Sequence, residues 1–247
     1  MSTQPDTANT ALIKAVLFDL DGTLLDTWPD FEVVLNRLLK EENKAPLDAG
    51  LIRATVSNGA RALVTLGFGI EPDHAEFEPL RERLLAHYSN HLAVHTRPFP
   101  GIEELLKKLG QHQLPWGIVT NKPFIYAQPL LRQLDLEPAP GTLICPEHVK
   151  ERKPHPESLY LACEQLGCAA NNCIYIGDHR RDIDCGKNAG AKTIAAAYGY
   201  IDNRREAESW QADHTVDSAY ELWPLIENYL SDAATGNRKL FRPSPLV

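Results

Sequence analysis

The sequence has no apolar run long enough to cross a membrane. A transmembrane helix needs about 20 consecutive, mostly apolar residues, and no stretch of the 247 residues reaches that length. Residues 1–14 have neither a basic start nor a long apolar stretch, so we expect no secretory signal. These absences predict a cytoplasmic protein with no membrane partner.

The chain has fewer basic than acidic residues. The chain carries 25 Lys and Arg against 33 Asp and Glu, a formal net charge of -8. Nucleic acids and anionic lipid surfaces are bound through basic protein surface, so this balance argues against both as partners. The composition, with 43% hydrophobic and 23% charged residues, is typical of a globular protein. We expect a small molecule as the partner, and the sequence makes no prediction of oligomeric state.

Cysteines are few, and their spacing shows no pairs. The five are odd in number and include no C-x-x-C pair: Cys145, Cys163, Cys168, Cys173 and Cys185. Structural zinc sites need ligand pairs at fixed spacing, and disulfide frameworks need an even number of cysteines. The pattern disfavours both, and we expect reduced thiols packed in the interior.

Short apolar segments alternate with helical patterns through most of the chain. Near-continuous apolar character over a few residues is typical of strands in a parallel sheet covered on both faces. Strands are predicted at 14–18, 116–120, 142–145, 173–177 and 192–197, and helices at 102–110, 124–134, 156–166 and 182–189. The alternation predicts an α/β fold with a Rossmann-like parallel sheet.

One interval, Trp28 to His95, contains helical patterns only. Apolar residues recur at helical spacing after Trp28, and Glu76–His95 is a second long helical candidate. We therefore predict an inserted α-helical cap domain at 27–95 and a core made of 12–26 and 96–230, with flexible tails at 1–11 and 231–247. The connecting segments, Leu24–Thr27 and the proline- and glycine-containing His95–Gly101, are the expected hinge.

Polar residues follow several of the predicted strands. In open α/β sheets, ligands bind at the carboxyl ends of the strands, and polar residues from four parts of the chain are expected at that edge. They are Asp19 and Asp21, Thr120 and Asn121, Lys153, and Asp178 and Asp182. This convergence predicts one functional site.

The order of these residues resembles a known family. D-x-D-G-T-L after the first strand, a threonine after a second, a lone lysine and then G-D-x-x-x-D resemble the four motifs of haloacid dehalogenase superfamily phosphatases. The likeness covers roughly Lys14 to Tyr200, and the helical insertion resembles the cap of that family. The resemblance implies a phosphatase that uses Mg²⁺.

The resemblance also implies roles for individual residues. Asp19 matches the nucleophile that forms an aspartyl-phosphate, and Asp21 the general acid and base. Thr120, Asn121 and Lys153 match groups that hold the phosphate. Asp19, a main-chain carbonyl at Asp21, and Asp178 would bind Mg²⁺. Asp182 would orient metal-bound water or pair with Lys153.

The substrate is the open question within the family. The acidic residue at position 21, Asp21, argues against a dehalogenase activity. The segments WGIVTNKP, LICPEHVK and YGYI resemble the bacterial N-acetylmuramic acid 6-phosphate phosphatases, which are similar to phosphoglycolate phosphatases. Both substrates carry a carboxylate, which Arg61 in the cap segment Ser57–Arg61 could bind, although an exposed arginine at a helix start is an equal alternative. We favour N-acetylmuramic acid 6-phosphate narrowly over 2-phosphoglycolate; a sugar-phosphate mutase stays an alternative.

Three other features are weaker. A phosphate-accepting signalling module is disfavoured because such modules lack a helical cap and carry the acceptor on a middle strand. His87, His91 and His95 recur every four residues and could line one helix face as metal ligands. The sequence offers no carboxylate or cysteine to complete that set, so we expect a solvated or hinge-side face. For Arg180 and Arg181 we favour a surface role slightly over contact with the substrate.

Overall fold

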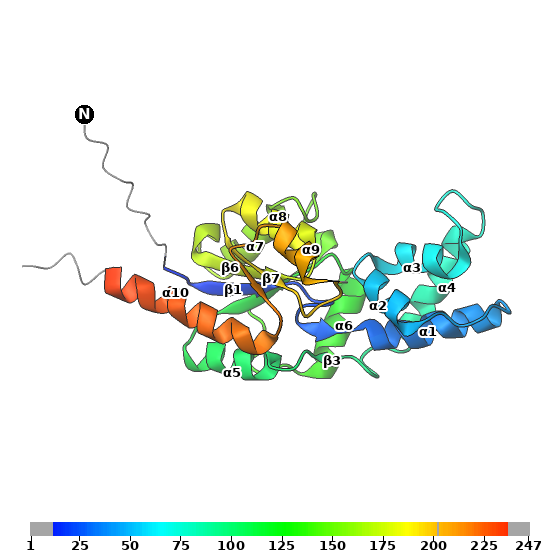
Figure 1. Cartoon of the computed structure of the whole chain (residues 1–247), viewed down its shortest axis with the longest axis horizontal. Coiled ribbons are helices and arrows are strands. Elements are labelled where there is room, and N and C mark those ends of the chain that lie inside the picture. Colours follow the sequence, from blue (N-terminus) through cyan, green and yellow to red (C-terminus); the bar gives the residue numbers. More distant parts are fainter. Residues whose placement is uncertain (1–11, 202, 237–247) are drawn as a thin grey trace, which may run out of the picture.

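A six-stranded parallel sheet forms the centre of the molecule (Figure 1). The computed structural model describes residues 12–201 and 203–236. The strands are β1 (Ala15–Phe18), β4 (Trp116–Val119), β5 (Leu143–Ile144), β6 (Cys173–Gly177), β7 (Lys192–Ala196) and β8 (His214–Val216). Their order, β5-β4-β1-β6-β7-β8, reads outward in both directions from β1, as in doubly wound folds. The predicted α/β class with a Rossmann-like parallel sheet is confirmed.

Helices cover both faces of the sheet because alternate strand residues point to opposite sides. Val16 and Phe18 of β1 pack into one apolar cluster, and Ala15 and Leu17 pack into another. The first cluster includes α5 (Ile102–Gln111), α6 (Phe124–Leu134) and α10 (Leu222–Gly236), and the second includes α7 (Glu157–Gln165). The helices α8 (Arg180–Ala189) and α9 (Arg204–Ser209) follow β6 and β7. The near-continuous apolar strands reflect this two-sided burial.

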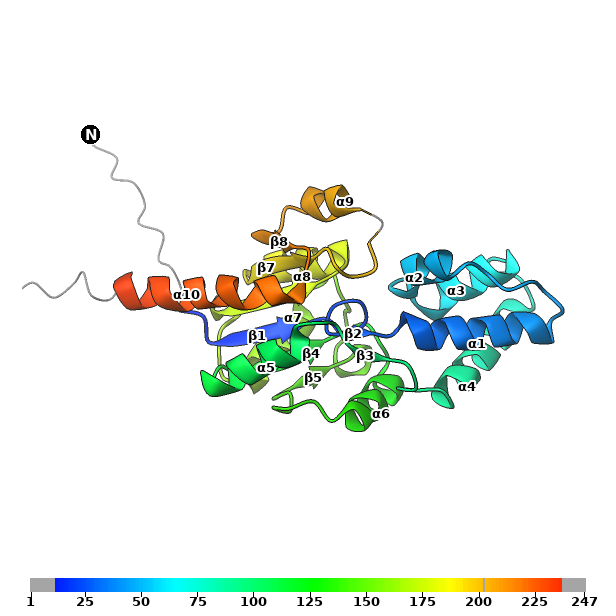
Figure 2. The same ribbon diagram turned by 60° about the horizontal axis from the view of Figure 1, so that its bottom comes forward.

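Four helices lie between β1 and the rest of the sheet in the sequence. They are α1 (Trp28–Glu41), α2 (Ala49–Val56), α3 (Gly59–Phe68) and α4 (Phe77–Ser89), and we call them the cap. The cap lies at one end of the sheet (Figure 2). Phe31 of α1 stacks on Tyr88 of α4 with ring centroids 4.0 Å apart. Buried residues of the cap and of the sheet belong to one continuous apolar cluster.

The chain crosses between cap and sheet at a small antiparallel pair, β2 (Leu25–Asp26) and β3 (Arg97–Pro98). Tyr200 fixes the first crossing: its hydroxyl accepts hydrogen bonds from the backbone N–H of Thr27 at 2.6 Å and of Trp28 at 2.9 Å. The same hydroxyl donates to Asp26 at 3.0 Å. Both crossings lie within the segments where we expected the hinge.

The structure differs from the predicted elements in three places. β8 was not predicted, because its three residues, His-Thr-Val, are too short to give a strand pattern. Helix α4 ends at Ser89, six residues before His95, and Ala93 then takes a left-handed conformation with φ of 58°. Helix α10 runs to Gly236, past the predicted boundary at 230. The tail predicted at 1–11, and residues 237–247 of the tail predicted at 231–247, lie outside the described residues.

Among the described residues, no helix combines the length and the apolar character needed to cross a bilayer.

Candidate active site

Asp19 and Asp21 lie directly after β1, where the chain turns sharply. Asp19 accepts a hydrogen bond from the backbone N–H of Leu20 at 2.7 Å, and Gly22 has a φ of 83°. A Cβ atom on Gly22 would lie 2.1 Å from Oδ2 of Asp178, and one on Gly199 would lie 2.3 Å from Cβ of Asp178. Glycine at these positions lets the Asp178 carboxylate approach the turn after β1.

Lys153 pairs with two of the carboxylates at this edge. Its Nζ lies 2.9 Å from Oδ1 of Asp19 and 2.7 Å from Oδ1 of Asp182. It also donates to the carbonyl oxygen of Val119 and to the hydroxyl of Tyr175, each at 3.0 Å. Burial opposes the charge of the ammonium group, but Asp182 and Asp19 outweigh it and raise the pKa of Lys153 to about 12. We call the six-stranded sheet and the helices that follow its strands the sheet domain. Lys153 is therefore a buried, charged group whose partners all belong to the sheet domain.

Asp178 and Asp182 are almost wholly buried, with 2% and 0% exposure. Burial, followed by the charges of Asp19 and Asp182, raises the pKa of Asp178 to about 7. Burial and Asp19 likewise raise the pKa of Asp182 to about 6, although Lys153 opposes the change. Asp182 also accepts a hydrogen bond from the N–H of His179 at 3.1 Å, which caps α8. Burial first, and the crowding of the carboxylates second, set the electrostatics of this group.

The three carboxylates fit a divalent cation. One oxygen each of Asp19, Asp178 and Asp182 lies within 4.8 Å of the others. Ionised, the three carry a charge of -3 against +1 on Lys153, so this cluster has an excess of two negative charges. Hard oxygen ligands with excess negative charge suit Mg²⁺. The residues present fit the ion that the sequence resemblance implies.

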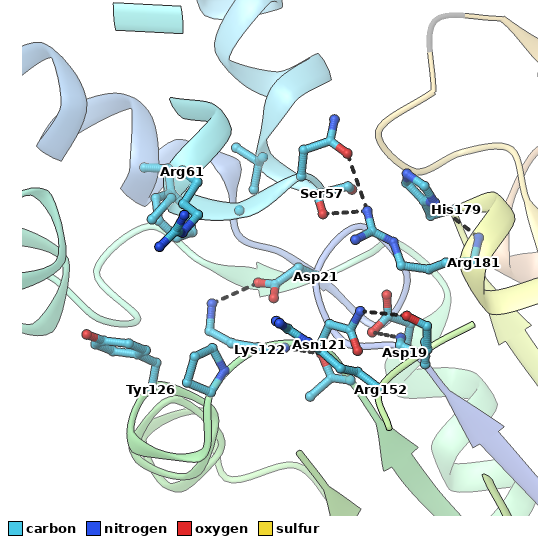
Figure 3. A pocket seen from close by; sticks show the side chains of 18 of the residues that line it. Asp19, Asp21, Ser57, Arg61, Asn121, Lys122, Tyr126, Arg152, His179 and Arg181 are labelled. Carbon is cyan, nitrogen blue, oxygen red and sulfur yellow. Dashed lines mark hydrogen bonds and ion pairs between the residues drawn. The ribbon is translucent and has the colours of Figure 1, made fainter. Parts of the chain in front are cut away.

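Lys122 holds Asp21 and was not predicted as a site residue. Its Nζ donates to Oδ1 of Asp21 at 3.0 Å (Figure 3) and to the hydroxyl of Tyr88 at 2.8 Å. Burial opposes its charge, but Asp21 outweighs this effect and raises the pKa of Lys122. Thr27 also donates to Oδ1 of Asp21, at 2.6 Å. Both hydrogen bonds fall on Oδ1, and among the described residues none is recorded on Oδ2 of this aspartate, which lines the cavity.

The sequence carries little signal for Lys122. It comes two residues after Thr120, in the segment Thr-Asn-Lys at the end of β4. A lysine at a strand end is usually solvated, and its partners Asp21 and Tyr88 are 101 and 34 residues away in sequence. Tertiary structure alone identifies it.

Thr120 and Asn121 lie where the sequence placed them, at the carboxyl end of β4. Thr120 is buried at 4% exposure, and its hydroxyl accepts a hydrogen bond from the N–H of Lys122 at 3.1 Å. The side-chain amide of Asn121 donates to the carbonyl of Lys153 at 3.4 Å. Both line the same cavity as Asp19 and Asp21. The predicted site residues from four parts of the chain therefore meet at one edge.

A cavity of about 290 Å³ opens between this edge and the cap. Arg61, Arg81, Arg152 and Arg181 line it together with Lys122. Arg61 is 61% exposed and pairs with Glu78 at 2.8 Å, while Arg81 pairs with the same carboxylate at 2.6 Å. Arg61 therefore lies at the cavity, as we expected, but shares a carboxylate with a second arginine from α4.

The cap also touches the sheet domain at the loop between α2 and α3. Ser57 donates to Oδ2 of Asp178 at 3.2 Å, and Arg181 donates to the carbonyl of Ser57 at 2.8 Å (Figure 3). The preference for a surface role does not describe Arg181, which is half-buried, lines the cavity and contacts this loop. It holds for Arg180, which is 68% exposed and lies 3.5 Å from Asp184.

Two further clusters of ligand-type side chains lie away from this cavity. Cys163, Cys168 and Cys173 lie together, with the sulfur of Cys173 3.2 Å from each of the other two. All five cysteines are free; four are buried, as expected of thiols packed in the interior, and Cys168 is half-buried. The second cluster corrects a prediction: Asp30 completes a set with His91 and His95, whereas His87 on α4 instead contacts Glu41. The three histidines share no helix face, because α4 ends at Ser89.

Comparison with known proteins identifies the family. The family model of haloacid dehalogenase-like hydrolases matches residues 16–196, and the chain belongs to this family. It is 44% identical over 220 residues to an N-acetylmuramic acid 6-phosphate phosphatase of Pseudomonas aeruginosa, covering 89% of this chain and 97% of that protein. It is 40% identical over 210 residues to a phosphoglycolate phosphatase of Xanthomonas campestris, covering 85% and 95%.

A solved structure shows the same fold. The crystal structure of a predicted phosphoglycolate phosphatase from Haemophilus somnus 129PT matches with a TM-score of 0.75 at 25% identity, covering 86% of this chain and 97% of that one. The resemblance noted in the sequence is confirmed, and the chain is a phosphatase of the haloacid dehalogenase type.

Proposed function

We propose that this phosphatase hydrolyses the phosphomonoester of a small, carboxylate-bearing metabolite through an aspartyl-phosphate on Asp19. The observation that carries the proposal is the cluster of Asp19, Asp178, Asp182 and Lys153, of which Asp19 and Lys153 line a cavity of about 290 Å³. A carboxylate nucleophile divides a difficult hydrolysis into two easier steps. The cavity confines a small substrate over that nucleophile.

The residues around Asp19 have complementary tasks in this scheme. Oδ1 of Asp19 accepts from Leu20 and is paired with Lys153, so Oδ2 is the oxygen that attacks phosphorus. Oδ2 of Asp21 donates a proton to the departing alkoxide and then takes one from the water that hydrolyses the intermediate. Thr120, Asn121 and Lys153 stabilise the negative oxygens of the phosphoryl group.

A Mg²⁺ ion belongs to the proposal. Asp19, Asp178 and the main-chain carbonyl at Asp21 would hold it, and Asp182 would orient its water and pair with Lys153. When bound, the ion supplies positive charge for the phosphate oxygens. EDTA should abolish release of phosphate from an aryl phosphate, and added Mg²⁺ should restore it; activity that persists in EDTA contradicts this part.

For the substrate we propose N-acetylmuramic acid 6-phosphate in preference to 2-phosphoglycolate. The name of the Pseudomonas relative supports the first substrate, and the name of the Xanthomonas relative supports the second. The higher identity to the Pseudomonas relative, 44% against 40%, supports N-acetylmuramic acid 6-phosphate as the first choice. The arginines that line the cavity suit the carboxylate of either substrate.

The deciding experiment compares kcat/KM for the two substrates and repeats the comparison with Arg61→Ala. Removing an arginine from a substrate carboxylate should lower kcat/KM about tenfold to a hundredfold. Arg83→Ala is the matched control, because Arg83 lies on α4 and pairs with Glu41 and Glu42 outside the cavity. Equal values for the two variants remove Arg61 from the site.

A second measurement separates hydrolase from mutase. Release of inorganic phosphate in proportion to substrate consumed supports hydrolysis. Formation of an isomeric sugar phosphate without net release supports the mutase alternative. Higher kcat/KM for 2-phosphoglycolate leaves the phosphatase chemistry in place and reverses our order of substrates.

A further inference from the structure

The hinge contains a buried carboxylate without a strong cationic partner. Asp30 lies in the first turn of α1, directly after the crossing at β2, and its exposure is 0%. Buried charges in proteins are normally paired or bound to a metal. Among the described residues the ion pair recorded for Asp30 is with His91, whose Nε2 lies 3.7 Å from Oδ1 of Asp30.

The hydrogen bonds of Asp30 leave one acceptor position open. Oδ2 accepts from the N–H and the hydroxyl of Thr96, at 3.1 and 2.6 Å, and Oδ1 accepts from the N–H of His95 at 2.8 Å. A carboxylate can accept about four hydrogen bonds, so one lone pair remains on Oδ1, the oxygen nearer His91. The three bonds also fix the orientation of the carboxylate.

The ring of His91 offers a second polar atom that is free to bind a ligand. Its Nε2 is buried and has no hydrogen-bond partner, the one such side-chain atom among the described residues. A distance of 3.7 Å to Oδ1 of Asp30 is too long for a direct hydrogen bond. Two ligands on one tetrahedral zinc ion, with bonds of about 2.0–2.2 Å, lie about 3.3 Å apart. The gap between Nε2 and Oδ1 is thus close to the separation across a shared ion.

A third ligand is at hand. One ring nitrogen of His95 lies within 4.8 Å of the other two ligand atoms, and the rings of His91 and His95 have centroids 5.5 Å apart. His95 is exposed, so the cluster is open to solvent on one side. Two imidazoles and one carboxylate suit Zn²⁺ and its neighbours in the first transition row, whereas Mg²⁺ prefers oxygen ligands.

We propose that Asp30, His91 and His95 bind a divalent transition-metal ion, Zn²⁺ or a close relative, at the hinge. Asp30 follows the crossing at β2, and His91 and His95 precede the crossing at β3. The ion joins both connections between cap and sheet at one point and restrains their relative motion. This site is separate from the carboxylate cluster around Asp19 and does not depend on the proposed substrate.

The test is a Co²⁺ titration of the full-length, tag-free protein in saturating Mg²⁺, which occupies the oxygen-ligand site. We expect one equivalent of Co²⁺ to give visible d–d absorption without a thiolate charge-transfer band, and Zn²⁺ to displace it. His91→Gln should weaken this binding at least about tenfold. His87→Gln, on α4 and paired with Glu41, should bind as the wild type does.

Thermal unfolding gives a second readout. Zn²⁺ should raise the Tm of the wild type and of His87→Gln, and leave the Tm of His91→Gln unchanged. The proposal is overturned if the wild type takes up no Co²⁺, if His91→Gln binds it as tightly, or if the spectrum shows only thiolate ligation by the cluster at Cys173.

Discussion

Two buried lysines hold the two aspartates of the turn after β1, and their surroundings differ. Lys153 contacts Asp19, Asp182, Tyr175 and Val119, which all belong to the sheet domain. Lys122 contacts Asp21 from the sheet domain and Tyr88 from the cap. Its ammonium also lies 4.6 Å from the Tyr88 ring centroid and 5.2 Å from that of Phe31.

The difference separates two parts of the chemistry. The partners of the Asp19–Lys153 pair all belong to the sheet domain, and the cap reaches this half through the contact of Ser57 with Asp178. The Asp21–Lys122 half is completed by α1 and α4, so the position of the cap decides how Asp21 is held. We infer that nucleophilic attack depends on the sheet domain, and that proton transfer depends also on cap closure.

The largest expected effect comes from the Asp19 half. Asp19→Asn removes the proposed nucleophile and should lower kcat by about 10⁴-fold or more. Mass spectrometry of quenched reactions should find no phosphorylated protein. Asp21→Asn is the informative companion, because it keeps Asp19 and should still accumulate the intermediate. Activity of Asp19→Asn within about a hundredfold of the wild type would falsify the role of Asp19.

Replacing each lysine by methionine should separate an effect on stability from an effect on proton transfer. Lys122→Met leaves Asp21, which is 18% exposed, in contact with water, and should lower kcat by about 10²–10³-fold with the fold retained. Lys153→Met leaves Asp182, which is 0% exposed, without its cation, and should cost about 3–5 kcal/mol in the free energy of unfolding. Urea unfolding measures the second quantity. Equal losses of stability in the two variants would contradict the contrast.

The pH dependence of stability should come from the Asp19 half. The pKa of Asp178 rises from 3.8 to about 7 on folding, so its neutral form favours the folded state. This contribution is complete below pH 3.8 and is lost as the pH rises through about 7. In EDTA, the Tm should therefore be lower at pH 8 than at pH 5, by on the order of 5 °C.

Two other groups titrate nearby and set the controls. The pKa of Asp182 is also raised on folding, so its contribution to stability likewise falls as the pH rises. Burial lowers the pKa of His179 to about 4, so the contribution of His179 is lost as the pH falls from 6.5 toward 4. Asp178→Asn isolates one group: its Tm should fall less between pH 5 and 8 than that of the wild type. Asp184→Asn, on the exposed side of α8, should behave as the wild type does. Parallel profiles for Asp178→Asn and the wild type would exclude Asp178 as the source.

The same contrast explains which features the sequence predicted. Asp19, Thr120 and Asp178 each follow a strand directly, so local pattern and the geometry of parallel strands bring them to one edge. Lys122 was missed because its partners come from elements far away in the sequence. Arg61 was placed at the cavity, but its pairing with Glu78 depends on how α3 packs on α4. Pairing across the cap requires tertiary structure.

Helix ends caused the remaining differences. Glu76–His95 was expected to be one helix, but α4 ends at Ser89, and the chain then turns back toward the hinge. The turn brings His91 and His95 close to Asp30, which lies at the other crossing, after β2. No local spacing in the sequence connects this carboxylate to the two histidines. Helix boundaries are the least certain part of a sequence pattern because capping contributes only about 1 kcal/mol.

The smallest expected effect tests the cap contact itself. Tyr88→Phe removes the hydroxyl that accepts from Lys122 but keeps the ring that stacks on Phe31. Burial raises the pKa of Tyr88 to about 12, so the residue is a neutral acceptor and its loss removes one hydrogen bond to an ammonium group. Such a bond contributes about 1.5–3 kcal/mol at most, so kcat should fall about tenfold, with KM little changed. Tyr126→Phe is the matched control, because Tyr126 also lines the cavity and its ring lies 5.8 Å from that of Tyr88. If the two variants have the same kcat, the cap does not act on Asp21 through Lys122, and the two halves of the site are equally independent of the cap.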